Sequence, residues 1–409
     1  MAATRVIVIG AGPVGVSAAL TLASAGVQVD LFESTAGPSS ASHASTFHPP
    51  TLEIFNEFGL ANEFIERGIK VRTLQYRDRD DGVLAEFDYS ALDDATSFPF
   101  RLQAEQREFT KMACARLAQY RHVNIHFNTE INSVRTDGTS AVAQASESEY
   151  RADWIIAADG AKSSARKALG IGFQGNTYQM RYLTVKTKAD LREFISGLSP
   201  VTYVSGGPDG FGVLQLPDHW RIALRVPEGV PENTATSAAY IESRLHKTLP
   251  DGPVEVPVLD HFIYFIHRRS ADQFKVGRVL LAGDAAHLNS PSGGMGMNSG
   301  IHDAYVLART ICELGQDQDA AHSALEDVSN TRKYVADEII GVRSDRNYRA
   351  ITTQDQVARA EYRVKMRGIA GDWDEAREYL MRASMLDHAP RPDQTIADFI
   401  GEPSRGLER

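Results

Sequence analysis

Residues 6–26 read VIVIGAGPVGVSAALTLASAG and decide the fold. The first four are a β-branched and apolar run, typical of a central parallel strand that is buried on both faces. A glycine-rich turn follows, and the small and apolar residues from Val14 to Ala25 predict a helix that ends at Gly26. Val27 to Phe32 predicts the next strand, with Glu33 after it. The stretch is therefore a βαβ unit, which implies a parallel sheet with right-handed crossovers.

The turn in this stretch has the pattern G-x-G-x-x-G, with glycines at Gly10, Gly12 and Gly15. The first glycine allows the tight turn, the second lets a pyrophosphate approach the backbone, and the third lets the helix pack close to the strand. Because the helix N-terminus offers free N–H groups and a positive dipole end, we expect Pro13 and Val14 to lie against the same phosphates. The pattern predicts a bound dinucleotide; the alternative is a glycine-rich turn without a ligand.

Glu33 stands eighteen positions beyond Gly15, at the end of the second strand. A carboxylate at this place accepts hydrogen bonds from ribose hydroxyls, and it repels a 2′-phosphate. We therefore expect FAD or NAD, rather than NADP, in this site.

The composition restricts the classes of protein and of partner. The chain has 409 residues, 43% hydrophobic and 23% charged, which is ordinary for a globular protein with two or three domains. Its formal charge of −10 argues against a nucleic-acid or anionic-membrane partner, since both require clustered Lys and Arg. Two cysteines, Cys114 and Cys312, are too few for a disulfide framework and match no metal site. Without a signal-peptide layout or a long apolar span, we expect a cytoplasmic protein.

The pattern of the chain changes twice after the first unit. Alternating residues from Tyr178 to Ile266 predict an antiparallel sheet covered on one face; residues 278–282 then return to a buried parallel-type strand, and the rest is mostly helical in pattern. We predict an α/β fold (α+β overall), in which a Rossmann-like domain with a parallel sheet is interrupted by an antiparallel-sheet substrate domain and followed by C-terminal helices. The expected ranges are 1–75, 101–177 and 270–345 for the discontinuous nucleotide-binding domain, 76–100 and 178–269 for the substrate domain, and 346–409 for the helical region.

A second glycine-rich turn follows the later apolar strand. It contains Gly283 and Asp284, and the chain continues as PSGGMGMN at residues 291–298. Asp284, at the carboxyl edge of a strand, is placed to hold sugar-alcohol hydroxyls, and a helix beginning near Gly296 points N–H groups at a partly anionic ring carbonyl. A flavin has a use for this second turn, because its ribityl chain and ring extend past the pyrophosphate. The alternative is a loop that only connects strand and helix.

The third motif is DGAKSSAR, residues 159–166, after another apolar strand. Ser163 and Arg166 are three positions apart and share one face of the first helical turns. An arginine at this place can meet a phosphate. The alternative is a helix capped by Asp159 with a solvated Arg166.

With these three motifs in order, the sequence resembles the class A flavoprotein monooxygenases, the p-hydroxybenzoate hydroxylase-like family, over nearly the whole chain. The resemblance implies FAD contacts by the first motif, by Gly283 and Asp284 at the ribityl chain, and by the loop from Pro291 with Gly294 beside the flavin ring. It places the pyrimidine end of the flavin at Gly296, Met297 and Asn298. It links Asp159, Gly160 and Arg166 to both FAD and NAD(P)H.

The resemblance also implies a reaction. NADH or NADPH reduces FAD, O2 forms a flavin C4a-hydroperoxide, and its hydroxyl is transferred to a small phenolic or hydroxylated heteroaromatic substrate. The flavin carries this chemistry, and the protein orients the reactants and excludes water. Two alternatives stay open: an oxidoreductase of the same fold that epoxidises or reduces an alkene, and a non-catalytic flavin-binding module. Relatives commonly form dimers, so a homodimer is also implied.

One stretch departs from the family. Many relatives have an arginine on the FAD phosphates shortly after the second strand, but no arginine lies between Arg5 and Arg67 here. We expect His43, or one of the serines of residues 40–45, to take that place. Gln106 is expected to contact FAD, with Gln103 as the competing assignment.

The residues around the substrate are the least defined. The resemblance places Pro291 next to the substrate, and His48 near the flavin is a candidate proton shuttle or a purely structural residue. A phenol attacks best as a phenolate, so some group must take or stabilise its proton. Alternation predicts that Tyr203 and Gln215 point inward, and an inward Arg225 would favour a carboxylated substrate. Further candidates are Arg221, Tyr264 and His267, and each of these residues has a structural role as its alternative.

Overall fold

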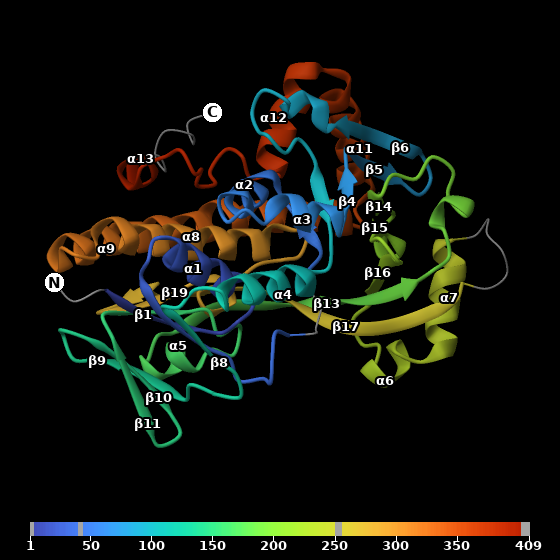
Figure 1. Ribbon diagram of the computed structural model, residues 1–409. Helices are drawn as coiled ribbons and strands as arrows, with labels where there is room; N and C mark the ends of the chain where they lie inside the picture. Colours follow the sequence, from blue (N-terminus) through green and yellow to red (C-terminus); the bar gives the residue numbers. More distant parts are fainter. Residues whose placement is uncertain (1–3, 40–43, 250–255, 402–409) are drawn as a thin grey trace.

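The computed structural model describes residues 4–39, 44–249 and 256–401. Its first layer is a six-stranded sheet in the order β18-β19-β12-β1-β2-β8, parallel except for the edge strand β18 (Figure 1). The strands are β1 (Arg5–Ile9), β2 (Gln28–Phe32), β8 (Val123–His126), β12 (Trp154–Ala157), β18 (Lys275–Val276) and β19 (Val279–Leu281). The predicted parallel sheet is thus confirmed, with β1 at its centre.

Both faces of this sheet are covered, which explains the unbroken apolar run of β1. Val6 and Val8 join a core with the helices on one side, and Ile7 and Ile9 join a second core on the other. The helices are α1 (Pro13–Ser24), α4 (Gln106–Leu117), α8 (Met295–Leu314) and α9 (Gln318–Tyr334). The opposite side carries α5 (Ser164–Ala168) and a small sheet of β9 (Ser133–Thr136), β10 (Ala141–Ala145) and β11 (Ser148–Ala152).

The second large sheet has eight strands in the order β20-β17-β13-β16-β15-β14-β5-β6. All of its pairings are antiparallel except that of β14 with β5. Long β13 and β17 run from the first layer into this sheet (Figure 1). Its strands are β5 (Thr73–Asp78), β6 (Gly82–Asp88), β13 (Phe173–Thr187), β14 (Val201–Ser205), β15 (Phe211–Gln215), β16 (Trp220–Val226), β17 (Val258–Ala271) and β20 (His287–Leu288).

One face of the eight-stranded sheet packs on α7 (Ala238–Thr248), preceded by α6 (Glu232–Ala235), through a core that includes Leu183, Val213 and Ile222. The other face carries Tyr76, Tyr182, Tyr203, Tyr264 and Arg225, and we call it the tyrosine-bearing face. A third sheet joins the two regions: β3 (Thr46–Phe47), β7 (Arg101–Gln103) and β4 (Ile69–Val71), beside α2 (Pro49–Glu57) and α3 (Ala61–Glu66).

The C-terminal part is helical, as predicted. A π-helical turn, Val335–Ile340, leads from α9 into α10 (Gly341–Thr352), α11 (Gln356–Gly371), α12 (Trp373–Ala383) and α13 (Ile396–Gly401). Helices α11 and α12 lie over β5 and β6, at the far end of the eight-stranded sheet (Figure 1). Within the described residues, no helix combines the length and the apolar character that crossing a membrane requires. The fold class is confirmed, and the domain ranges stay a prediction.

Candidate active site

The three sequence motifs meet at one edge of the parallel sheet. Gly10 follows β1, Glu33 follows β2, Asp159 follows β12, and Asp284 follows β19. These four strands are consecutive neighbours, in the order β19-β12-β1-β2. In open α/β sheets this carboxyl edge is where ligands bind.

Close backbone approaches join the first motif to the other two. Gly10 has φ 98°, and a Cβ on it would lie 2.4 Å from the carbonyl oxygen of Ala158. A Cβ on Gly283 would lie 2.8 Å from Cγ2 of Val14. By contrast, a Cβ on Gly12 would meet nothing within 4 Å, so the space beside the start of α1 is open. Open space at a helix N-terminus fits the pyrophosphate of a dinucleotide.

Glu33 holds the glycine turn in place. Its Oε2 accepts from the backbone N–H of Ala11 at 2.9 Å, and its Oε1 accepts from that of Thr35 at 3.0 Å. Burial acts to raise the pKa of Glu33, but the hydrogen bonds outweigh it and the pKa is lowered. The side chain is therefore a carboxylate near pH 7. Its expected contact with ribose stays a prediction.

The third motif is tied to the second by Arg166. This side chain is buried and donates to the carbonyl oxygens of Ala285 at 2.8 Å and Ala161 at 2.9 Å. The alternative of a solvated Arg166 is therefore wrong. Ser163 is the N-cap residue of α5, and its Oγ accepts from the N–H of Arg166.

Asp159 has one satisfied and one unsatisfied oxygen. Oδ2 accepts from the N–H of Ala165 at 3.1 Å, whereas Oδ1 is buried without a hydrogen-bond partner. An orphaned carboxylate oxygen at this edge of the sheet, beside Gly160, fits the hydroxyls of a bound nucleotide.

The buried Asp303 holds the turn of the second motif through its two carboxylate oxygens. Its Oδ2 accepts from Nε2 of His287 at 2.7 Å and from the N–H of Gly283 at 3.3 Å, and its Oδ1 accepts from Nε of Arg332 at 2.6 Å. Burial acts to raise the pKa of Asp303, but Arg332 and His287 outweigh it and lower the pKa to about 2. This buried network fixes the turn that presents the exposed Asp284.

The loop after it begins at the exposed Pro291 and ends at Gly294, which has φ 70° and caps α8. Helix α8 starts at Met295, one residue earlier than the sequence indicated. Gly296 and Met297 are half-exposed in its first turn, where backbone N–H groups have no intrahelical acceptor. This turn fits the partly anionic end of a flavin ring.

Asn298 was expected to face the pyrimidine end of the flavin, but its side chain forms hydrogen bonds within the protein. Its side chain is fully buried; Oδ1 accepts from the N–H of His48 at 3.0 Å and from Oγ1 of Thr51 at 2.8 Å. Its Nδ2 donates to the carbonyl oxygens of Thr46 at 2.9 Å and Gly294 at 2.7 Å. Only the backbone of Asn298 is therefore left to face a flavin.

His48 is also fully buried, with Nε2 3.0 Å from the carbonyl oxygen of Gly293. Burial, reinforced by the nearby charge of Arg101, holds the pKa of His48 well below its usual 6.5. The imidazole is neutral near pH 7, which disfavours the protonated state that a proton shuttle needs.

The two candidate glutamines occupy different environments. Gln103 is buried and bonds the hydroxyls of Thr46 and Ser45 through its amide, so its side chain serves β3. Gln106 is half-buried and accepts from the N–H of Ala44 at 3.1 Å. This favours Gln106 as the cofactor residue. His43 lies outside the described residues.

The register of the eight-stranded sheet corrects one expectation about the substrate region. Tyr203 pairs with Gly212 and stacks on Tyr76 at 5.6 Å between ring centroids. Gln215 is three residues beyond Gly212 on β15 and pairs with Trp220, whose ring belongs to the core under α7. Side chains alternate along a strand, so Tyr203 and Gln215 point to opposite faces. The expectation that both point inward is wrong, and Tyr203 is the one on the tyrosine-bearing face.

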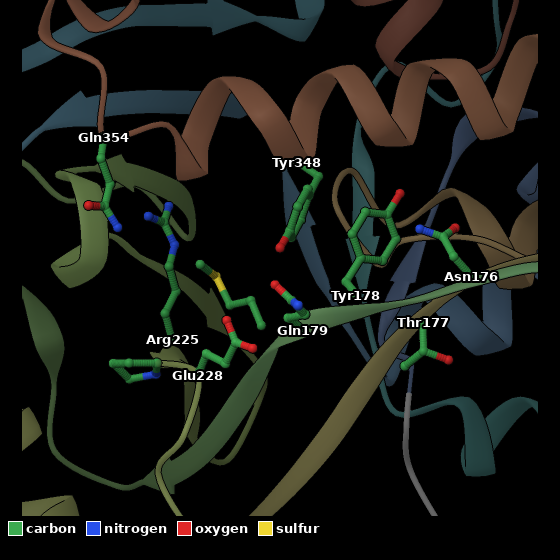
Figure 2. Close-up of a pocket in the computed structure, with 10 residues that line it drawn as sticks. Asn176, Thr177, Tyr178, Gln179, Arg225, Glu228, Tyr348 and Gln354 are labelled. Atoms are coloured by element: carbon green, nitrogen blue, oxygen red, sulfur yellow. The ribbon is translucent and has the colours of Figure 1, made fainter.

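Arg225 lines a cavity of about 570 Å³ at the other end of this face, together with Tyr178, Glu228 and Tyr348. Figure 2 shows these side chains around it, below the helix that carries Tyr348. The guanidinium of Arg225 donates to the carbonyl oxygens of Gly207 and Ile351. Both terminal nitrogens are thus engaged within the protein, which argues against a carboxylate clamp.

Two contacts of the site were not predicted from the sequence, although Arg221 itself was a candidate. Arg221 forms a buried ion pair with Glu105, with Nη2 2.8 Å from each carboxylate oxygen. Arg101, on the short strand β7, is 1% exposed and faces the tyrosines. No motif or periodicity marks Arg101, or the pairing of Arg221 with Glu105.

Comparison with known proteins agrees with this geometry. Residues 3–342 match the family model of the FAD binding domain. The chain is 28% identical over 390 residues to para-nitrophenol 4-monooxygenase of Pseudomonas sp. (strain WBC-3), covering 93% of this chain and 96% of that one. It is 26% identical over 386 residues to 6-hydroxy-3-succinoylpyridine 3-monooxygenase of Pseudomonas putida, covering 92% and 96%. The crystal structure of p-nitrophenol 4-monooxygenase from Pseudomonas putida DLL-E4 superimposes with a TM-score of 0.87 at 28% identity, covering 94% of this chain and 98% of that one.

Proposed function

This chain belongs to the FAD binding domain family, and on that premise we propose that it hydroxylates a small phenol with NADH or NADPH and O2. It is a flavin-dependent monooxygenase that acts on aromatic compounds. The proposal concerns the finer points: the phenol, the nicotinamide cofactor, and the residues that hold FAD and substrate.

The observation that carries the proposal is the convergence of three motifs and a tyrosine-bearing sheet face. The motifs contact one another at the carboxyl edge of the parallel sheet, through Gly10, Val14 and Arg166. The sheet face adds the buried Tyr182 and the half-buried Tyr203 and Tyr264. Such a surface accommodates an aromatic ring, since aromatic pairs pack favourably by stacking or edge-to-face.

FAD, when bound, supplies the oxidation–reduction chemistry and the activation of O2. The residues proposed to hold it divide by position. Gly12, Pro13, Val14 and Gly15 would lie at the pyrophosphate, and Glu33 at the adenosine ribose. Asp284 would hold the ribityl hydroxyls. The first turn of α8, with Gly296 and Met297, would stabilise negative charge on the ring by its N–H groups and dipole.

The proposed substrate class follows from the relatives. Two of the relatives are described as acting on a nitrophenol and on a hydroxypyridine, and both compounds carry a ring hydroxyl. A hydroxyl activates the ring for attack, more so when ionised. We therefore place a phenol between Tyr203 and the loop at Pro291.

The experiment is a turnover assay with the purified holoenzyme. Flavin content is confirmed by absorbance, and oxidation of NADH and of NADPH is followed with a panel of phenols and hydroxylated N-heterocycles. The proposal expects one of these compounds to stimulate oxidation and to yield a hydroxylated product. Turnover of an alkene without stimulation by any aromatic compound would replace the proposal with an alkene oxidoreductase.

A further inference from the structure

Arg101 is a buried cation without a buried anion beside it. Its side chain is 1% exposed, and its Nη2 donates to the carbonyl oxygen of Ala383 at 2.9 Å. Its Nε and Nη1 are buried and have no hydrogen-bond partner. Among the residues that the structure describes, no carboxylate forms an ion pair with it. Leaving a buried charge uncompensated is costly, so this arrangement points to a missing anion.

Tyrosine hydroxyls surround this guanidinium. Burial acts to lower the pKa of Arg101, but electrostatic interactions with Tyr89, Tyr203, Tyr76 and Tyr379 outweigh it and raise the pKa. These four come from separate segments: β5, the turn after β6, β14 and α12. They converge on the tyrosine-bearing face of the eight-stranded sheet.

The tyrosines themselves do not neutralise the charge. Burial raises the pKa of Tyr76 well above 10, and it also raises the pKa of Tyr89 and of Tyr379. All three are neutral phenols at pH 7. They can donate hydrogen bonds, but they leave the positive charge of Arg101 uncompensated.

The other two buried arginines of this face have partners within the protein for their terminal nitrogens. Arg221 is paired with Glu105, and Arg225 donates to two backbone carbonyls. Arg101 differs from Arg221 in having no carboxylate partner, and from Arg225 in having a terminal nitrogen, Nη1, without a hydrogen-bond partner.

The position of Arg101 connects the two halves of the site. It lies on β7, which pairs with β3, the strand directly before His48. Its charge acts on His48, which contacts Gly293 of the glycine loop, and on Tyr203 of the sheet face. Arg101 therefore acts on both parts of the site between which the proposed function places the ring.

We propose that Arg101 binds the oxygen of the substrate as a phenolate, with the surrounding tyrosine hydroxyls as additional donors. The inference rests on the proposed function and deepens it: the preferred substrates are phenols acidic enough to ionise near neutral pH. Such a phenol gives its proton to water before or during binding. No protein base is then required, and the ionised ring is the form that attacks an electrophilic oxygen best.

The test is a binding titration of the FAD-loaded enzyme with 4-nitrophenol, whose absorbance distinguishes phenol from phenolate. In the wild-type enzyme we expect the bound compound to ionise at a pH at least about one unit lower than in water. 4-Nitroanisole, which cannot ionise, should bind without this pH dependence. Wild-type enzyme that holds 4-nitrophenol in its neutral form would overturn the proposal, whatever the variants do.

Variants then assign the effect to one residue. Arg101→Met should weaken binding of the phenolate roughly 10- to 100-fold and abolish the shift in its ionisation, with little change for 4-nitroanisole. Arg101→Lys, which retains the charge, should restore part of the shift. Arg116→Met is the matched control: Arg116 also donates to one backbone carbonyl, that of Phe58 at 3.0 Å, but it lies on α4 away from the tyrosines.

Failure of this inference can be told apart from failure of the proposed function. If wild-type enzyme hydroxylates phenols but Arg101→Met, with full flavin content, binds 4-nitrophenolate unchanged, only the inference is overturned. If no phenol stimulates turnover although 4-nitrophenolate binds at Arg101, the proposed function fails while the anion site stands.

Discussion

Nε2 of His287 and Oδ2 of Asp303 lie 2.7 Å apart in the protein interior, below the turn that presents Asp284. The same carboxylate receives Nε of Arg332 at 2.6 Å, so β20, α8 and α9 meet at one buried charge. The position of the second motif thus depends on residues that do not themselves face a ligand.

Removing that charge should destabilise the protein. Asp303→Asn leaves Arg332 buried without a carboxylate, which we expect to cost about 3–5 kcal/mol of unfolding free energy. The pKa of Asp303 is lowered to about 2, from an ordinary value near 4, so its stabilising contribution is complete above pH about 4 and is lost as the pH falls toward 2. Denaturant titrations of both proteins across this range check the prediction. Equal free energies of unfolding at pH 7 would contradict it.

Alanine substitutions at two glycines of the first motif should change different properties: one the stability of the apoprotein, the other the affinity for FAD. Gly10→Ala places a Cβ 2.4 Å from the Ala158 carbonyl oxygen at a positive φ, so we expect a lower melting temperature even without FAD. Gly12→Ala meets no protein atom within 4 Å, so the apoprotein should keep its stability. Its FAD affinity should fall about tenfold or more, because the methyl group occupies the place of the pyrophosphate. Melting curves of the apoproteins and flavin titrations provide the two readouts.

Asp284→Ala should lower FAD occupancy sharply. The side chain is exposed at the turn, so its removal is expected to change the stability of the apoprotein little. The measurement is the flavin-to-protein ratio after purification, beside the melting temperature of the apoprotein. Unchanged flavin content would refute the role assigned to Asp284.

Buried neutral histidines should make the protein sensitive to mild acid. Burial, with the charge of Arg332 nearby, holds the pKa of His302 well below 6.5, and Nε2 lies 3.0 Å from Oγ1 of Thr51. Its contribution is present above pH about 6.5 and is lost as the pH falls below that value, since the unfolded chain then binds the proton. His302→Gln keeps a donor for Thr51 but cannot be protonated. Its unfolding free energy should therefore fall less steeply between pH 7 and pH 5 than that of the wild type.

The sequence was informative where neighbours along the chain determine the structure. The strand, turn and helix around Gly10, Gly12 and Gly15 form a local unit, and the motifs at Asp159 and Asp284 follow strands of the same parallel sheet, so their convergence was predictable. Tyr203 and Gln215 lie on different strands, and their relative facing depends on the register of β14 with β15, which no local pattern encodes. Arg101 acquires its setting from Tyr76, Tyr203 and Tyr379, which are far apart in the chain. Asn298 was placed correctly at the start of α8, but the amide turned inward to join β3 and α2.

The central claim is that the chain hydroxylates an aromatic ring with an oxygen atom from O2. Its most direct test is turnover of the FAD-loaded enzyme with reduced nicotinamide and an accepted phenol under isotopically labelled O2, followed by mass spectrometry of the product. The account predicts a hydroxylated product that carries one labelled oxygen atom. A product that contains no labelled oxygen, formed while the reduced nicotinamide is consumed, would contradict it.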